Sequence, residues 1–239
     1  MNKIFSFKGS VRKLIYFINA VLVFSCKHPI CEDLKIEEKK EEIITSHRVS
    51  FKPGPEGKDA AISSYYPDSS FAAIESLNLI AWTITRNRIF EKFYMDFDLS
   101  TLVPPGAKVT SAVLNLSADV RTAYLGYRGH VSSPDDSGWK VNIVTSPWEE
   151  NNISWFNQPT IDELELSVEK GPTRYNQKYS VNITTYAQGK LKKDSNVKGL
   201  SFDFYKKVNN ITDCMIRFCS SDHQSEELRP ELIIHYEMI

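Results

Sequence analysis

The sequence predicts an all-β protein, an antiparallel β-sandwich of the jelly-roll type with one short helix. Three observations support this fold class. Apolar residues recur at every second position in many short segments, clusters rich in Pro and Gly separate those segments, and one segment alone has helical periodicity. About ten short strands with little helix are typical of a sandwich or a jelly roll.

The alternation begins near His47 and marks the strands. Phe93, Met95 and Phe97 share one face of their segment, and Phe202 alternates with polar neighbours in the same way. Such segments fit strands with one buried face. The predicted strands are RVSFK, DAAISS, SLNLIAWTI, RIFEKFYMDFDL, KVTSAVLNLSA, WKVNIVTS, QKYSVNI, GLSFDFYK, CMIRFC and ELIIHY.

The helical candidate is the segment NITTYAQGKLKKD. Ile183, Tyr186, Ala187 and Leu191 fall on one stripe of a helix there. We expect this short amphipathic helix to close one end of the sandwich.

The first 25 residues resemble a signal peptide. Four basic residues and no acidic residue accompany the apolar run LIYFINAVLVF, which is short for a membrane span. The following VFSC resembles the lipobox of bacterial lipoproteins, which implies cleavage before Cys26 and acylation of that residue. The protein is then expected outside the cell, lipid-anchored to the bacterial outer membrane or cell surface. The alternative is a plain secretory signal with an incidental cysteine.

Residues 26–46 are predicted to be a disordered tether. Six acids and four bases lie between residues 27 and 46, with too few bulky apolar groups to offset the entropy of ordering. Acidic residues soon after the cysteine also resemble the surface-export signal of Bacteroidetes lipoproteins. Residues 47–239 then form one sandwich domain.

The charge of the chain argues against nucleic acid as a partner. The formal net charge is -1, and removing the leader takes away four positive charges, which leaves -5. Phosphate binding needs clustered Lys and Arg.

Several blocks together resemble a known family. GPEGKDAAISSYYPD, FDLSTLVPPGAKVTSAVLNL, SPWEENNISWFNQP, SVNITTYAQGKL and RPELIIHY occur in the order and rough spacing of the disaggregatase-related (DNRLRE) domain, which is also classed as a carbohydrate-binding module. The resemblance runs from about Phe51 to Tyr236. It implies an extracellular β-sandwich that binds polysaccharide, including acidic polysaccharides such as alginate for some members. Residues 72–88 and 117–138 depart from the family pattern.

Polysaccharide recognition needs exposed aromatic faces for sugar rings and guanidinium groups for hydroxyls and carboxylates. The segment VRTAYLGYRGH and the nearby SGWK supply both, and Trp82 with Arg86 and Arg88 forms a second cluster. The alternative is that these residues fold over an edge of the sandwich. The candidate ligand-binding residues are Arg121, Tyr124, Tyr127, Arg128, Trp139 and Trp82.

Trp148 and Trp155 flank the run EENNIS in the strongest family block. A buried Trp contributes a large apolar area, so we expect both to hold this loop against the sandwich. Sugar stacking is the alternative. Asp59 and Asp68 lie in turn-rich segments and are the nearest candidates for a structural calcium, because Ca²⁺ prefers oxygen ligands.

The sequence offers no catalytic motif, so we expect a protein that is not an enzyme. Two alternatives stay open. One is a structural or adhesive surface protein with a protein partner, and the other is a polysaccharide lyase or hydrolase. Cys214 and Cys219 end one strand on opposite sides, so a bond between them is not expected.

Overall fold

The computed structural model describes residues 5–7, 44–121, 123–131, 137–205 and 213–238. Cys26 and the predicted tether up to position 43 lie outside these residues. Within them, no helix is both long and apolar enough to cross a membrane.

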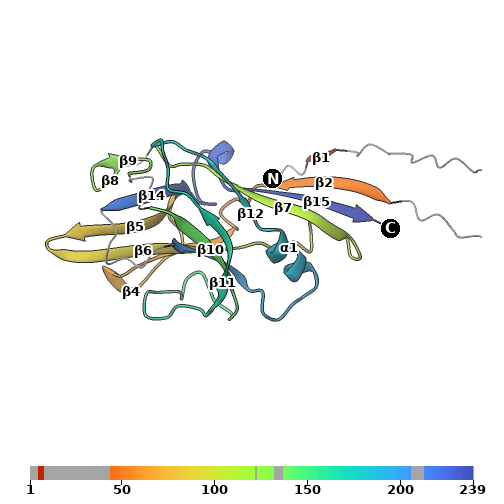
Figure 1. Ribbon diagram of the computed structural model, residues 1–239, viewed down its shortest axis with the longest axis horizontal. Coiled ribbons are helices and arrows are strands. Elements are labelled where there is room, and N and C mark those ends of the chain that lie inside the picture. The colour runs from red at the N-terminus through yellow and green to blue at the C-terminus, as the bar shows by residue number, and fades with distance from the viewer. Residues whose placement is uncertain (1–4, 8–43, 122, 132–136, 206–212, 239) are drawn as a thin grey trace, which may run out of the picture.

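Two antiparallel sheets form the sandwich (Figure 1). The first sheet has five strands in the order β1 (Phe5–Phe7), β2 (Thr45–Phe51), β15 (Glu231–Met238), β7 (Lys108–Leu116) and β12 (Tyr179–Asn182). The second has eight strands, of which six follow the order β11 (Ile161–Glu169), β10 (Trp139–Val144), β13 (Gly199–Phe204), β6 (Asn87–Asp96), β3 (Lys58–Ser63) and β4 (Tyr66–Phe71). The other two, β5 (Ser76–Ile84) and β14 (Cys214–Cys219), continue from β6, because β5 pairs with β6 and β14 pairs with β5.

The prediction of an all-β sandwich is confirmed, and each of the ten predicted segments contains a strand. Alternation follows the buried face, as in β7, where Ala112, Leu114 and Leu116 point into the core. Val109 is also buried although it lies three positions before Ala112. A register shift between β15 and β7 at this point adds one residue and moves the buried side by one position.

The core lies between the sheets and is rich in aromatic rings. Phe93 and Phe202 stack with their ring centroids 4.4 Å apart, and Phe218 meets Phe93 edge to face at 5.9 Å. Stacked and edge-to-face rings add to the stability that buried area alone provides.

In the described part of the chain, α1 (Thr184–Leu191) is the single α-helix, and it closes one end of the sandwich, as predicted. Tyr186 and Ala187 are buried. The Tyr186 hydroxyl donates to Asp96 Oδ1 over 2.7 Å and accepts the Phe97 amide over 2.9 Å. Both contacts tie the helix to the end of β6.

Two short elements complete the described chain. The hairpin of β8 (Ala123–Tyr124) and β9 (Tyr127–Arg128) lies at the end of the molecule that carries the turn between β5 and β6, and β15 ends at the opposite end (Figure 1). A 3-10 helix, η2 (Glu226–Leu228), precedes β15.

Candidate functional site

Trp148 and Trp155 are packing residues. Trp148 is 5% exposed and lies in a cluster with Ile62 and Tyr94. Its indole N–H donates to the Lys198 carbonyl over 3.1 Å. Trp155 is partly buried against the same cluster. The 145–160 loop is therefore held to the outside of the second sheet by its tryptophans.

Trp139 requires a correction, because it offers no face to a ligand. It is fully buried, and its ring lies 5.1 Å from Tyr179, 5.5 Å from Phe218 and 6.2 Å from Phe202. Trp139 begins strand β10, as the predicted strand WKVNIVTS does, but its side chain points into the core instead of towards solvent. It belongs to the core.

The 117–131 segment covers a face of β5, β6 and β14. Tyr124 and Val131 of this segment pack on a buried cluster of Ile80, Ile89 and Met215. For Tyr124, the alternative stated above therefore applies: this residue folds over the sandwich and packs on it.

The same fold brings the two predicted ligand clusters together. Trp82 packs at the border of this covered face, and its ring lies 5.5 Å from the ring of Tyr127. Tyr127 is 46% exposed and Trp82 is half-buried. We call this ring pair, together with Arg86 in the adjacent turn, the Trp82–Tyr127 surface.

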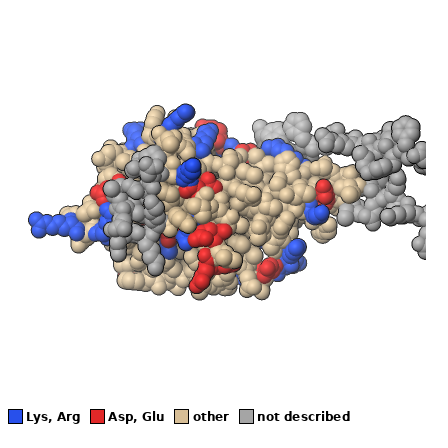
Figure 2. All heavy atoms as spheres, viewed as in Figure 1, with Lys and Arg blue, Asp and Glu red and all other residues tan. Residues whose placement is uncertain are grey.

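Two arginines lie at the same end of the β5–β6 hairpin, and Arg88 is on the opposite face of the sheet from Trp82 because it pairs with Thr83. Arg86 lies in the two-residue turn between β5 and β6 and is exposed. Arg88 forms an ion pair with Asp213. Figure 2 shows Lys and Arg side chains at this end of the molecule. Guanidinium groups beside aromatic rings can bind sugar hydroxyls and carboxylates.

Arg121 and Arg128 hold the 117–131 segment in place rather than extend the ring pair. The Arg128 guanidinium donates to the Arg121 carbonyl over 2.5 Å, and the Arg121 guanidinium donates to the Ser225 hydroxyl. Both residues are exposed. Their contacts brace the hairpin that presents Tyr127.

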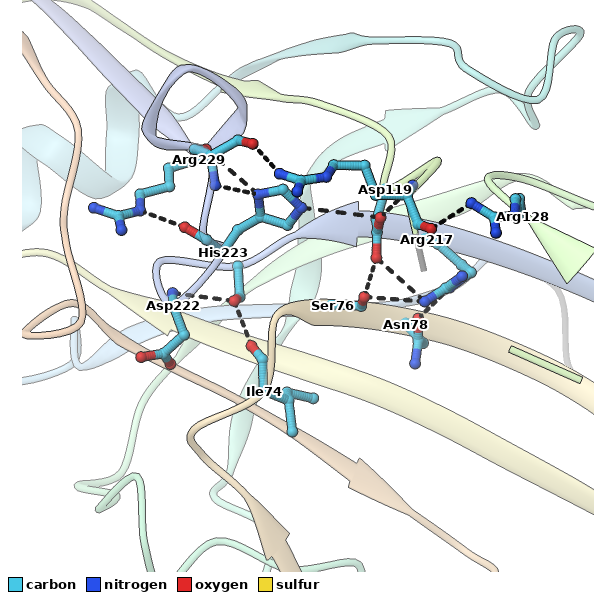
Figure 3. Close-up of polar contacts among 12 residues, drawn as sticks. Ile74, Ser76, Asn78, Asp119, Arg128, Arg217, Asp222, His223 and Arg229 are labelled. Atoms are coloured by element: carbon cyan, nitrogen blue, oxygen red, sulfur yellow. Dashed lines mark hydrogen bonds and ion pairs between the residues drawn. The ribbon is translucent and has the colours of Figure 1, made fainter. Parts of the chain in front are cut away.

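A buried polar network lies beneath the segment (Figure 3). Arg217 is 2% exposed, and its Nη2 donates to Asp119 Oδ2 over 3.3 Å and to Ser76 over 3.0 Å. Its Nε donates to Asn78 Oδ1 over 3.2 Å. Burial lowers the pKa of Arg217, and the charge of Asp119 opposes that shift.

Glu91 extends the network towards Tyr124. Its carboxylate accepts the Tyr124 hydroxyl over 2.9 Å and the Asn78 amide over 3.3 Å. Burial raises the pKa of Glu91. The network ties the covering segment to β5, β6 and β14.

Sequence reasoning missed this network, although one signal was present. Arg217 is the single charged residue in the otherwise apolar strand CMIRFC. A charge on a strand buried on both faces requires a buried partner. Its partner, Asp119, lies 98 positions away, which no local pattern reveals.

The predicted calcium ligands Asp59 and Asp68 lie on the paired strands β3 and β4. In the described part of the chain, Asp59 and Asp68 do not belong to any group of three potential ligands within 4.8 Å of one another. Asp68 is exposed on β4, whereas Asp59 is 1% exposed and accepts the Ser221 amide over 2.9 Å. Burial, with further contributions from the charges of Asp222 and Glu150, raises the pKa of Asp59 to about 7.

A cavity of about 410 Å³ opens near α1, between Phe51, Lys58, Asp96 and Lys190. Both of its lysines are engaged, because Lys58 donates to the Trp148 carbonyl over 2.6 Å and Lys190 pairs with Asp96 at 2.8 Å. The cavity therefore offers a uronate no unpaired lysine, and the Trp82–Tyr127 surface is the better candidate.

Comparison with known proteins identifies the family. No curated protein matches the chain significantly. The family model for carbohydrate-binding module family 96 matches residues 52–236, which include both sheets apart from β1, β2 and the end of β15. The resemblance to a carbohydrate-binding module is thus confirmed over nearly the whole sandwich. This chain belongs to carbohydrate-binding module family 96.

Proposed function

We propose that this carbohydrate-binding module binds an acidic polysaccharide at the Trp82–Tyr127 surface without cleaving it. The observation that carries the proposal is the contact between Trp82 and Tyr127, which places an exposed ring at the end of the sheet where the β5–β6 turn carries Arg86. The aromatic faces contact the sugar rings, and Arg86 binds the carboxylates.

Affinity electrophoresis with alginate and with a neutral glucan tests the proposal. We expect alginate to retard the protein, and added salt to weaken the retardation because it screens charge pairs. Tyr127→Ala should weaken alginate binding about 10-fold, as loss of a central aromatic contact costs on the order of 1–2 kcal/mol. The matched control is Phe156→Ala, which removes a 73% exposed ring from the 145–160 loop.

Arg86→Gln separates acidic specificity from general sugar binding. It should weaken binding to alginate more than binding to any neutral glucan that is retained. Equal effects on both polymers contradict a uronate ligand, and wild-type binding that survives Tyr127→Ala contradicts the location. Release of reducing or unsaturated ends from the polysaccharide contradicts binding without cleavage.

The proposal includes export and lipid anchoring through Cys26, supported by the basic and apolar leader and the VFSC sequence. We expect the wild-type protein to partition into the detergent phase and a Cys26→Ala variant to stay in the aqueous phase. Unchanged partition of the variant contradicts the anchor. Failure of this test leaves the polysaccharide proposal unaffected, because that proposal concerns the sandwich alone.

A further inference from the structure

Asp119 faces a second group of side chains besides Arg217. Cys219 ends strand β14, and His223 follows in the next turn. One carboxylate oxygen of Asp119, the Cys219 sulfur and one imidazole nitrogen of His223 all lie within 4.8 Å of one another. All three residues are fully buried, and Figure 3 shows His223 and Arg217 approaching Asp119 from different sides.

His223 has one ring nitrogen whose hydrogen-bonding capacity is not used. Its Nδ1 lies 3.1 Å from the Ser225 amide, which donates to it, and 3.4 Å from the Ser225 carbonyl. Its Nε2 is buried and has no hydrogen-bond partner among the described residues. Asp119 Oδ1 lies 3.9 Å from Nε2, which is too long for a hydrogen bond. A buried polar atom left in this state is costly and points to an absent ligand.

We propose that Asp119, Cys219 and His223 form a binding site for a zinc ion beneath the 117–131 segment. A thiolate, an imidazole and a carboxylate are the ligand types that Zn²⁺ takes in proteins. The three ligand atoms are at most 4.8 Å from one another. Metal-ligand bonds of about 2.0–2.3 Å require these separations to shorten by on the order of 1 Å from that upper bound.

The surroundings provide support for these ligands. Zinc at Nε2 requires the proton of the imidazole to be on Nδ1, which then donates to the Ser225 carbonyl, 3.4 Å away, instead of accepting the Ser225 amide. Asp119 Oδ1 also accepts the Arg121 amide over 2.9 Å, and Oδ2 accepts the Ser76 hydroxyl. These contacts orient the carboxylate.

Zinc binding requires Cys219 as a thiolate, so the thiol releases one proton to solvent when the metal binds. Burial and the nearby Asp119 charge raise the pKa of the Cys219 thiol to about 12 when no metal is present. Because the ligands come from the segment after β7, from the end of β14 and from the turn after it, the ion holds these three parts of the chain together. The burial of the site fits a structural ion.

Cobalt substitution tests the site directly. The full-length chain is prepared with Cys26→Ser and Cys31→Ser, so that thiolate absorption reports only Cys214 and Cys219. The protein is stripped with a chelator and titrated with Co²⁺ and then with Zn²⁺. We expect one equivalent of Co²⁺ to give a thiolate-to-cobalt absorption band in the near ultraviolet, and Zn²⁺ to displace it. A folded protein without this band overturns the proposal.

The two buried cysteines of β14 supply a matched pair of variants. Cys219→Ser should abolish the band, and His223→Gln should weaken Co²⁺ binding more than about 100-fold, beyond the loss typical of groups that only support a ligand. Cys214→Ser should keep the band, because Cys214 lies in the central core. A band that survives Cys219→Ser, or that is lost in Cys214→Ser, overturns the assignment.

The thermal unfolding temperature provides a readout that does not use absorption. Zn²⁺ should raise this temperature in the wild type and in Cys214→Ser, and not in Cys219→Ser. An equal rise in all three proteins overturns the site. None of these measurements depends on polysaccharide binding, so failure of the zinc site and failure of the proposed function are distinguishable.

Discussion

The 145–160 loop and the 117–131 segment both pack on strand β6, but they bury different chemistry. The 145–160 loop places Trp148 and Ile153 on an apolar cluster that includes Tyr94. The 117–131 segment buries Asp119 against the Arg217 guanidinium and also covers apolar residues.

The difference shows how each of the two segments is held on the sheet. Apolar burial is non-directional, so the 145–160 loop can be held by ring area alone. A buried ion pair is directional and requires that each charge keep its partner. The 117–131 segment is therefore positioned by specific contacts, and this accuracy sets the place of Tyr127 at the surface.

The largest expected effect is on the apolar side of the comparison. Trp148→Ala should lower the free energy of unfolding by about 3–5 kcal/mol, because it leaves a cavity beside Tyr94. Denaturant-induced unfolding measures the change. Phe156→Ala in the same loop should change it by less than about 0.5 kcal/mol, because that ring is 73% exposed. Similar losses in the two variants contradict the role of Trp148 as a packing residue.

The next effect concerns the ionic side. Asp119→Ala leaves the buried Arg217 charge without its partner and should cost about 3 kcal/mol. Unfolding is measured in the presence of a chelator, so that a bound metal cannot contribute. Asp213→Ala removes the partner of the more exposed Arg88 and should cost less than about 1 kcal/mol. Equal costs contradict the distinction between a buried and a surface ion pair.

The third effect is a dependence on pH and concerns Asp59, a buried acid that contacts the 145–160 loop. Glu150 of that loop accepts the Asp59 amide, and the Asp59 pKa rises from 3.8 in the unfolded chain to about 7 in the fold. Between these values the folded protein holds a proton that the unfolded chain has released. Stability from this group is therefore present below pH 3.8 and is lost as the pH rises to about 7.

Unfolding free energies of the wild type and Asp59→Asn, measured from pH 4 to about 7, check this dependence. The wild type should lose up to about 1.4 kcal/mol per pH unit relative to the variant. Parallel pH profiles contradict the shift. Added Ca²⁺ that stabilises the wild type near neutral pH and not Asp59→Asn supports the calcium prediction for Asp59, and an equal response in both contradicts it.

The fold was predictable in large part because its signal is local. Ten strands and α1 follow from side-chain periodicity within single segments. The strand β11 was missed, because Leu164 and Val168 are 78% and 51% exposed and charged residues interrupt the apolar pattern. An edge strand does not need a buried face, so it carries no clear alternation.

The candidate site was predictable only in part. Composition indicated Tyr127, Arg86 and Trp82 as residues suited to a sugar, but not that two of them are in contact. Trp139 also lies beside a basic residue, Lys140, yet its side chain is buried. Whether a residue near a strand end points inward depends on the register of that strand against its partners.

The sequence alone determined the period of the ten predicted strands and the position of the helix, because these depend on neighbouring residues. Only the tertiary structure determined which segment covers which face. Arg217 meets Asp119 and Ser76 across 98 and 141 positions. Such contacts form only when the sheets bring distant segments together, and they place Tyr127 beside Trp82 and His223 beside Cys219.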